Sequence, residues 1–257
     1  MLRKFTPLAL AAGILCTTPA LALPVLYGGN TSGRFFSVDD LSDGNPMTSI
    51  STGGYDMAGL AYDFDSGSGL YGGNDTRFFS IDVHTGAQTV IDGSVDYDIQ
   101  ALVFGPGGVL FGGNGSRFYS VDPTTGAMTN IKNNVDYGIR GLAYDRQAGI
   151  LYGTGGTLNR FYTIDPITGN QTLINGNTAG LNDIAIHQLT GVMYGGSNPL
   201  IGSGNWYTID KATGVATLAS GSPSFSTNSL AFIPEPGTAV LLAAGILGLG
   251  MAGRKRA

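Results

Sequence analysis

The residues best suited to ligand chemistry occupy one equivalent position in a repeated sequence. Five short segments, GLAYD, ALVFG, GLAYD, DIAIH and SLAFI, recur along the chain. The residue immediately before each segment differs from copy to copy, and the five are Ala58, Gln100, Arg140, Asn182 and Asn228. Asp183 opens the fourth segment. Amide, guanidinium and carboxylate groups gathered at one place can orient a polar ligand such as a sugar.

Aromatic and basic residues recur close to these positions. The loops before the segments carry Tyr55, Tyr97, Tyr137 and Phe225, and a second set of equivalent positions carries Arg34, Arg77, Arg117 and Arg160, with Asn205 in the fifth copy. Such residues can stack on sugars, but repetition in every copy favours a packing role, because fold requirements repeat whereas sites usually break symmetry. The predicted ligand-binding residues are therefore Gln100, Arg140, Asn182, Asp183 and Asn228. Tyr55, Tyr97 and Tyr137 are secondary surface candidates.

The sequence gives little indication of a metal site or a catalytic site. His84 and His187 lie in different repeats, and no spacing indicates an activated nucleophile or a metal cluster. The segment Asp63–Gly67 resembles a calcium loop but lacks the downstream Glu ligand. We predict no catalytic residue, no metal and no cofactor. A net charge of -5 predicts no nucleic-acid partner.

These residues must be positioned by a repeat that covers most of the chain. Copies of LYGGN-like sequence open at Leu26, Leu70, Leu110, Leu151 and Met193, at intervals of 44, 40, 41 and 42 residues. In the third unit, strand-like segments cover 109–111, 117–121, 128–131 and 141–144, which we name B, C, D and A. A fixed period of about 40 residues with four short strands indicates a radial β-repeat architecture.

The C and D segments are joined by short sequences of one kind, which begin at Asp82, Asp122, Asp165 and Asp210 and end in Gly. Asp binds the following backbone amides and Gly takes a left-handed conformation, so the pattern predicts tight turns. A row of metal-binding aspartates is the alternative, but each aspartate belongs to a different repeat. The first repeat departs from the pattern, with a longer loop over 39–45.

The two ends of the repeat region predict how the ring closes. Residues 24–233 begin with a B segment and end with an A segment, so the last segment would complete the first sheet and remove open edges. We predict an all-β, five-bladed β-propeller of twenty strands, with the A strands nearest the axis. The repeats resemble kelch-like and quinoprotein-like propeller repeats in pattern, without matching the diagnostic residues of any one family. An open β-solenoid is the alternative.

Both ends of the chain lie outside this region. Residues 1–22 combine Arg3 and Lys4, an apolar run and an Ala-Leu-Ala site, which is the pattern of a secretory signal peptide. Residues 234–257 contain Pro234-Glu235-Pro236, seventeen uncharged residues from Gly237 to Gly253, and Arg254-Lys255-Arg256. Seventeen residues are near the short limit for a membrane-spanning helix. We predict one C-terminal hydrophobic helix, either a transient or a permanent anchor.

The order Pro-Glu-Pro, apolar helix and basic tail resembles the PEP-CTERM sorting signal of Gram-negative bacteria, over residues 234–257 only. The resemblance implies processing by an exosortase, transient anchoring in the inner membrane, and a destination in the periplasm, outer envelope or extracellular matrix. Proteins with this signal often occur in organisms that make exopolysaccharide. The resemblance implies no activity for the repeat region.

These patterns together predict an exported, non-catalytic propeller that binds polysaccharide or an envelope protein. A secreted glycan-cleaving hydrolase or lyase is one alternative. It requires two carboxylates at one end of the axis, of which the sequence supplies Asp183. A structural surface protein without a ligand is the other.

Overall fold

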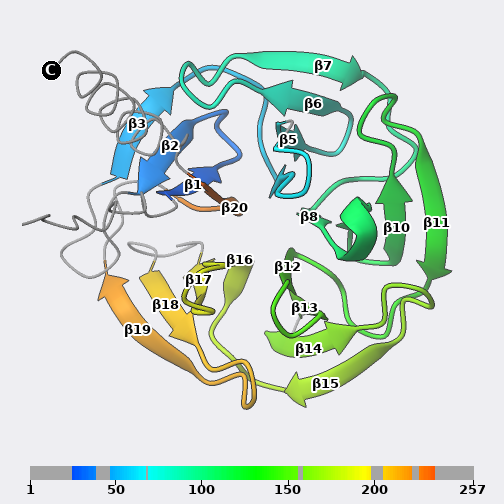
Figure 1. Cartoon of the computed structure of the whole chain (residues 1–257), viewed down its shortest axis with the longest axis vertical. Coiled ribbons are helices and arrows are strands. Elements are labelled where there is room, and N and C mark those ends of the chain that lie inside the picture. Colours follow the sequence, from blue (N-terminus) through cyan, green and yellow to red (C-terminus); the bar gives the residue numbers. More distant parts are fainter. Residues whose placement is uncertain are drawn as a thin grey trace, which may run out of the picture. The chain divides into compact units, whose positions relative to one another are not determined.

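The computed structural model describes residues 25–38, 47–67, 69–155, 159–197, 205–221 and 226–234. In this part of the chain, five four-stranded antiparallel sheets form a closed ring (Figure 1). The predicted all-β, five-bladed propeller of twenty strands is confirmed, and the closed ring excludes an open solenoid. Pro24–Pro234 form one compact unit.

Each blade runs from an inner A strand to an outer D strand. Blade 1 contains β20 (Ser229–Ile233), β1 (Val25–Gly29), β2 (Phe35–Val38) and β3 (Met47–Ser51). Blade 2 contains β4 (Gly59–Tyr62), β5 (Leu70–Gly73), β6 (Phe78–Ile81) and β7 (Gln88–Asp92). Blade 3 contains β8 (Ala101–Phe104), β9 (Leu110–Gly113), β10 (Arg117–Val121) and β11 (Met128–Asn133), with a short 3₁₀ turn, η1 (Pro106–Gly108), between the first two.

The remaining blades repeat this order. Blade 4 contains β12 (Gly141–Asp145), β13 (Ile150–Gly155), β14 (Arg160–Ile164) and β15 (Gln171–Asn175). Blade 5 contains β16 (Leu181–Ile186), β17 (Met193–Ser197), β18 (Asn205–Ile209) and β19 (Ala216–Gly221). Figure 1 shows β8, β12, β16 and β20 around the centre and the D strands on the perimeter, and β4 lies between β20 and β8. The small-residue segments therefore surround the axis, as predicted.

The ring closes by pairing the last strand with the first. β20 is antiparallel to β1, with Val25 opposite Ile233 and Gly29 opposite Ser229. This pairing covers the edge of β1 and completes the four-stranded sheet of blade 1, as the order of segments in the sequence predicts.

The Gly-Gly pair of the repeat makes room for two neighbouring side chains. A Cβ atom on Gly113 would lie 2.6 Å from Ile139 Cγ2, and one on Gly112 would overlap the ring of Tyr119. Tyr119 comes from the adjacent C strand and is fully buried. The glycines of the B strands are therefore required by close packing.

Neighbouring blades are packed together by aromatic side chains of the C strands. β6, β10 and β14 each contain two consecutive aromatic residues. Successive side chains of a strand point to opposite faces of the sheet. Phe78 accordingly packs between blades 2 and 3, and Phe79 packs between blades 1 and 2. Burial of each ring contributes roughly 2 kcal/mol, and the interfaces between blades form the core.

The turns between C and D strands have the predicted geometry. Asp122 Oδ1 accepts hydrogen bonds from the amides of Thr124 (2.8 Å) and Thr125 (3.3 Å), and Gly126 has φ 79°. These amide bonds lower the pKa of Asp122. The same arrangement recurs at Asp82, Asp165 and Asp210. These four aspartates therefore serve the turns.

Four of the sequence-based predictions concern residues outside the described ranges. They are the signal peptide over 1–22, the first-repeat loop, Phe225, and the segment from Glu235 to Ala257 with its hydrophobic helix and basic tail. Of the Pro-Glu-Pro sequence, the structure describes Pro234 alone, which is exposed. In the described part of the chain, no helix combines the length and the apolar character needed to cross a bilayer.

Candidate ligand-binding site

Four of the five predicted site residues line one recess. Its volume is about 240 Å³, and it is lined by Ala58, Asp75, Gln100, Arg140, Asn182 and Asn228. We call these six residues the polar pocket. Four blades contribute a polar side chain from the position just before or at the start of the inner strand, and Asp75 comes from a B–C loop. Residues more than 150 positions apart in the sequence thus meet at one place.

Backbone hydrogen bonds hold the lining residues at one level. The amide of Gln100 donates to Gly113 O (3.0 Å), that of Arg140 to Thr154 O (2.8 Å), and that of Asn228 to Gly29 O (2.9 Å). Each acceptor is at or next to the end of the B strand of the same blade. The repeat therefore sets the positions of these side chains, while the sequence varies their chemistry.

The polar groups of the pocket are largely uncommitted. Asn182 Nδ2 donates to Thr227 O (3.2 Å). Asn228 Oδ1 is buried and accepts no hydrogen bond from a described residue. Within the same ranges, the side chains of Gln100 and Arg140 make no hydrogen bond or ion pair. Buried polar groups are normally paired, so the pocket offers donors and an acceptor to a ligand.

Asp75 was not predicted from the sequence. It is exposed at the pocket edge, and partial burial raises its pKa, with further contributions from the negative charges of Asp98 and Asp56. Equivalent B–C loops read Asn-Thr-Ser and Asn-Gly-Ser, where this loop reads Asn-Asp-Thr. The same criterion of broken symmetry, applied to the B–C loops, would have identified Asp75.

Asp183 does not line the pocket, which corrects its placement at the channel mouth. β16 carries a bulge between Leu181 and Asp183, and the Asp183 side chain is fully buried. Its carboxylate accepts from the amides of Ile184 (2.8 Å) and Leu230 (2.6 Å) and from that of Leu142. Burial raises its pKa well above the ordinary value, against the opposing effect of these amides. Asp183 links three inner strands and is not placed to contact a ligand.

The repeated tyrosines and arginines stack on each other. Arg77 lies 4.7 Å from the centre of the Tyr55 ring, Arg117 lies 4.8 Å from that of Tyr97, and Arg160 lies 4.6 Å from that of Tyr137. The tyrosine rings also contact the aromatic residues Phe79, Tyr119 and Tyr162 of the C strands. This geometry favours the packing role for the secondary candidates.

The segment that resembles a calcium loop is a turn. Asp63 Oδ1 accepts from the amides of Asp65 (3.0 Å) and Ser66 (3.1 Å), and Gly67 has φ 62°. His187 occupies the equivalent position in blade 5, where its Nδ1 accepts from the Thr190 amide (3.2 Å). Among the residues that the structure describes, no three His, Cys, Asp or Glu side chains are grouped to hold a metal ion.

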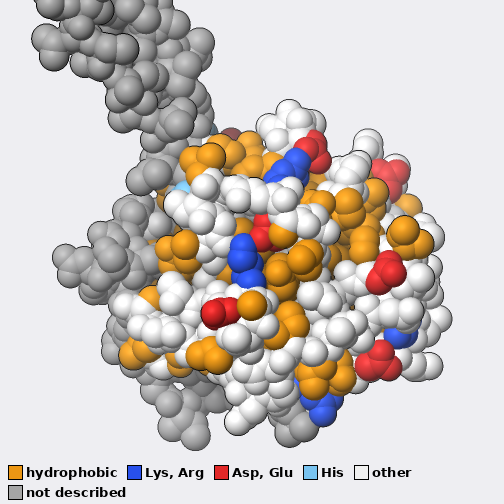
Figure 2. All heavy atoms as spheres, turned by 60° about the horizontal axis from the view of Figure 1, so that its bottom comes forward, with side chains coloured by type: hydrophobic (Ala, Val, Ile, Leu, Met, Phe, Trp, Pro, Cys, Tyr) orange, Lys and Arg blue, Asp and Glu red, His pale blue; other side chains and the backbone are white. Residues whose placement is uncertain are grey.

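The charged side chains form no extended patch on the face shown in Figure 2. Acidic and basic residues are scattered there, singly or in small groups, among uncharged and apolar ones. A continuous basic surface, as nucleic-acid backbones require, is absent from the described residues on that face.

Comparison with known proteins supports the fold. The sequence matches no protein-family model and no curated protein. The structure is similar to a chain of a nidogen–laminin complex (TM-score 0.57, 14% identity, covering 78% of this chain and 79% of that one). It is also similar to a symmetrical protein described for its de novo evolutionary emergence (TM-score 0.55, 17% identity, covering 80% of this chain and 97% of that one). A third similar structure is a gluconolactonase of Xanthomonas campestris (TM-score 0.51, 11% identity, covering 80% of this chain and 78% of that one). At these identities the likeness concerns the fold alone.

Proposed function

We propose that this chain is an exported, non-catalytic β-propeller that binds polysaccharide through the polar pocket, at the cell envelope or in the extracellular matrix. One observation carries the proposal. Gln100, Arg140, Asn182 and Asn228 break the symmetry of the repeat, and they line a single recess. Their donors and the free Asn228 acceptor suit hydroxyl groups, which both donate and accept.

The size of the polar pocket favours a saccharide over a protein surface. A volume of about 240 Å³ is small for a whole drug-sized ligand but suits one polar unit of a longer chain. A protein partner would bury about 800 Å² of this chain's surface, which extends well beyond the recess. An envelope protein is therefore the second choice of ligand.

A glycan-active enzyme is the alternative function. The gluconolactonase neighbour acts, by its description, in glucose secondary metabolism, and it shares the fold at 11% identity. Glycoside hydrolysis requires two carboxyl groups about 5–9.5 Å apart. Asp75 is the one carboxylate among the described residues that line the pocket, and Asp183 is buried elsewhere. Asp56 and Asp98 lie near enough to Asp75 to raise its pKa but do not line the pocket. The lining thus offers one carboxyl group where hydrolysis needs two, which favours binding over turnover.

A glycan array tests the proposed function directly. The purified full chain is applied to the array and to immobilised polysaccharides, and the soluble fraction is analysed for cleavage products. Binding without products supports the proposal. Cleavage products would contradict the proposal and support the glycan-active enzyme. A chain that neither binds nor cleaves a glycan would also contradict it and would support a structural role without a ligand.

Substitution of the pocket residues locates the binding. Gln100→Ala, Arg140→Ala and Asn182→Ala together are expected to weaken polysaccharide binding by tenfold or more, since each polar contact contributes about 1 kcal/mol. The control is Arg77→Met, which changes a residue stacked on Tyr55. Equal loss in both proteins would contradict the assignment.

The proposed export depends on the two ends of the sequence. Exosortase processing, transient contact with the inner membrane, and a periplasmic or extracellular destination are proposed from residues 1–22 and 234–257. Mass spectrometry of the protein recovered from cells is expected to find Leu23 as the first residue and the basic tail removed. Recovery of a chain that still begins at Met1 would contradict this route.

A further inference from the structure

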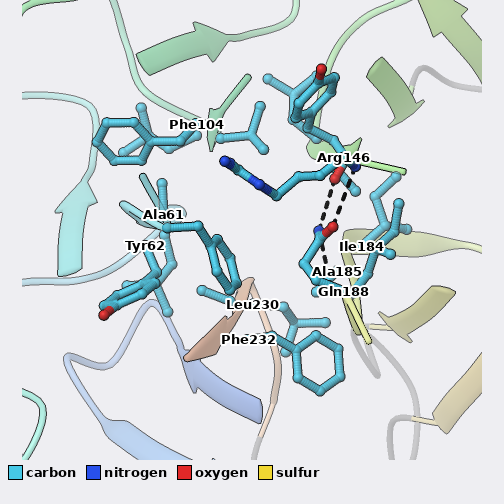
Figure 3. A pocket seen from close by; sticks show the side chains of 18 residues that line it. Ala61, Tyr62, Phe104, Arg146, Ile184, Ala185, Gln188, Leu230 and Phe232 are labelled. Carbon is cyan, nitrogen blue, oxygen red and sulfur yellow. Dashed lines mark hydrogen bonds between the residues drawn. The ribbon is translucent and has the colours of Figure 1, made fainter. Parts of the chain in front are cut away.

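The opposite end of the axis contains a second and chemically different cavity (Figure 3). Its volume is about 40 Å³, and its lining includes Tyr62, Phe64, Phe104, Phe232 and Arg146. It shares no residue with the polar pocket. A cation thus lies among apolar and aromatic side chains at the far ends of the inner strands.

The turn between β12 and β13 holds Arg146 in place. Asp145 accepts from the amides of Gln147 and Ala148 at 3.0 Å, which shapes the turn. Gln188 Oε1 accepts from the Arg146 amide (3.3 Å), and Gln188 Nε2 donates to Tyr144 O (2.9 Å). Figure 3 shows the Arg146 side chain reaching from this support across the cavity towards Phe104.

The guanidinium group of Arg146 is only partly satisfied. Its Nη2 donates to Asp65 Oδ1, and its Cζ lies 5.8 Å from the centre of the Phe64 ring. Its Nη1 is buried and has no hydrogen-bond partner among the described residues. The neighbouring Asp145 carboxylate is committed to Lys211 Nζ at 2.5 Å. A buried charged donor without an acceptor is costly, so Nη1 is available to an acceptor from outside the chain.

A larger groove adjoins the small cavity. It has a volume of about 370 Å³ and is lined by Asp65, Gly105, Pro106, Gly107, Tyr144 and Arg146. Tyr144 and Arg146 line both spaces. The small cavity holds a group of about the size of one water molecule, while the groove can hold the rest of a larger molecule.

We propose that this end of the propeller binds a small monocarboxylic acid with an apolar tail. One carboxylate oxygen accepts from Arg146 Nη1 inside the small cavity. The tail lies in the groove against Pro106 and the Tyr144 ring. The attraction comes from the vacant Nη1 donor, because the Asp65 carboxylate already balances the guanidinium charge. Asp65 also repels an added anion, and it repels a dianion more strongly than a monocarboxylate.

The test uses 4-phenylbutyrate as the probe and 4-phenylbutanol as its uncharged counterpart, titrated into the purified full chain by calorimetry. The acid is expected to bind at least about tenfold more tightly than the alcohol, because hydrogen bonds to charged groups contribute about 1.5–3 kcal/mol. Absence of binding by the acid, or equal binding of the two probes, would overturn the proposal.

Two substitutions locate the site and change affinity in opposite directions. Arg146→Met is expected to remove the preference for the acid over the alcohol. Asp65→Asn is expected to strengthen acid binding severalfold, since it removes the carboxylate that competes for the guanidinium. Arg160→Met is the control, because Arg160 stacks on Tyr137 at another place. Acid binding that survives Arg146→Met, or that weakens in Asp65→Asn, would contradict the site. Should Arg146→Met not fold, the Asp65→Asn titration decides.

Discussion

At the scale of the residue, Asp183 shows how one side chain serves three blades. Its carboxylate receives backbone amides from β12, β16 and β20, and it is fully buried. Removal of a buried acceptor leaves donors unpaired at about 1–3 kcal/mol each. Asp183 breaks the symmetry of the repeat and was therefore predicted as a ligand contact, but it helps to hold the inner strands that carry the residues of the polar pocket.

Burial raises the folded-state pKa of Asp183, which makes its effect on stability depend on pH. The folded protein favours the protonated side chain, so this contribution is full below about pH 4 and is lost as the pH rises through the folded-state pKa. We predict that the wild-type protein has a higher free energy of unfolding than Asp183→Asn. This difference is expected to be largest at acid pH and to shrink towards neutral pH. Urea unfolding of both proteins over this range measures it.

The four aspartates of the C–D turns affect the pH dependence of stability in the opposite direction. Their contribution is the same in wild type and in Asp183→Asn, so it cancels in the difference. Amide hydrogen bonds lower the pKa of Asp82, Asp122, Asp165 and Asp210, so their contribution is lost as the pH falls below about 4. Both proteins contain all four. A difference between wild type and Asp183→Asn that does not change with pH would contradict a raised pKa for Asp183.

At the scale of the element, the tight turns differ in what surrounds their glycines. Gly169, between β14 and β15, has φ 70°, and a Cβ atom there would lie 2.6 Å from Lys132 Cβ. Gly149, between β12 and β13, has φ 71°, and a Cβ atom there would meet nothing within 4 Å. Both turns need a left-handed residue, but only the first also packs against the neighbouring blade.

This pair yields a matched prediction. Gly149→Ala is expected to lower the free energy of unfolding by about 1 kcal/mol, the cost of a left-handed alanine. Gly169→Ala is expected to lower it by about 1–3 kcal/mol more, because the added methyl group must displace packed neighbours. Urea unfolding measures both variants. Equal destabilisation of Gly149→Ala and Gly169→Ala would contradict the packing of the Gly169 turn against the neighbouring blade.

Local patterns were readable from the sequence, whereas contacts between blades were not. The Asp–Gly turns depend on neighbours in the chain, so their sequences predicted them. The bulge at Leu181–Asp183 and the place of Asp75 in the pocket depend on how separate strands meet. Position before the inner strand indicated that Gln100, Arg140, Asn182 and Asn228 would lie together, and they line one recess because the repeat fixes that position in every blade. Their role in ligand binding stays a prediction.

At the scale of the whole molecule, the five repeats are held together by one strand from the far end of the chain. β20 supplies Leu230 and Phe232 to the core between blades 5 and 1, and it covers the edge of β1. Without it, β1 would present an open edge and the two adjacent interfaces would lose their inner residues. The ring therefore depends on contacts of very long sequence separation.

Truncation tests this dependence. A chain that ends at Asn228 is expected to lose the cooperative unfolding transition and to aggregate, whereas a chain that ends at Pro234 is expected to keep the transition and to stay in solution. Circular dichroism with size-exclusion chromatography distinguishes them. Cooperative unfolding of the shorter chain would mean that closure by β20 is dispensable.

The central claim is that ligand binding belongs to the residues that break the symmetry of the repeat. The most direct measurement compares the same substitution at two arginines: Arg140→Met in the polar pocket, and Arg117→Met where the guanidinium stacks on Tyr97. Affinity is measured for the glycan with the highest signal on the array. We predict that Arg140→Met weakens binding about tenfold and that Arg117→Met leaves it unchanged. Equal affinity of the two variants, or loss in Arg117→Met alone, would contradict the claim.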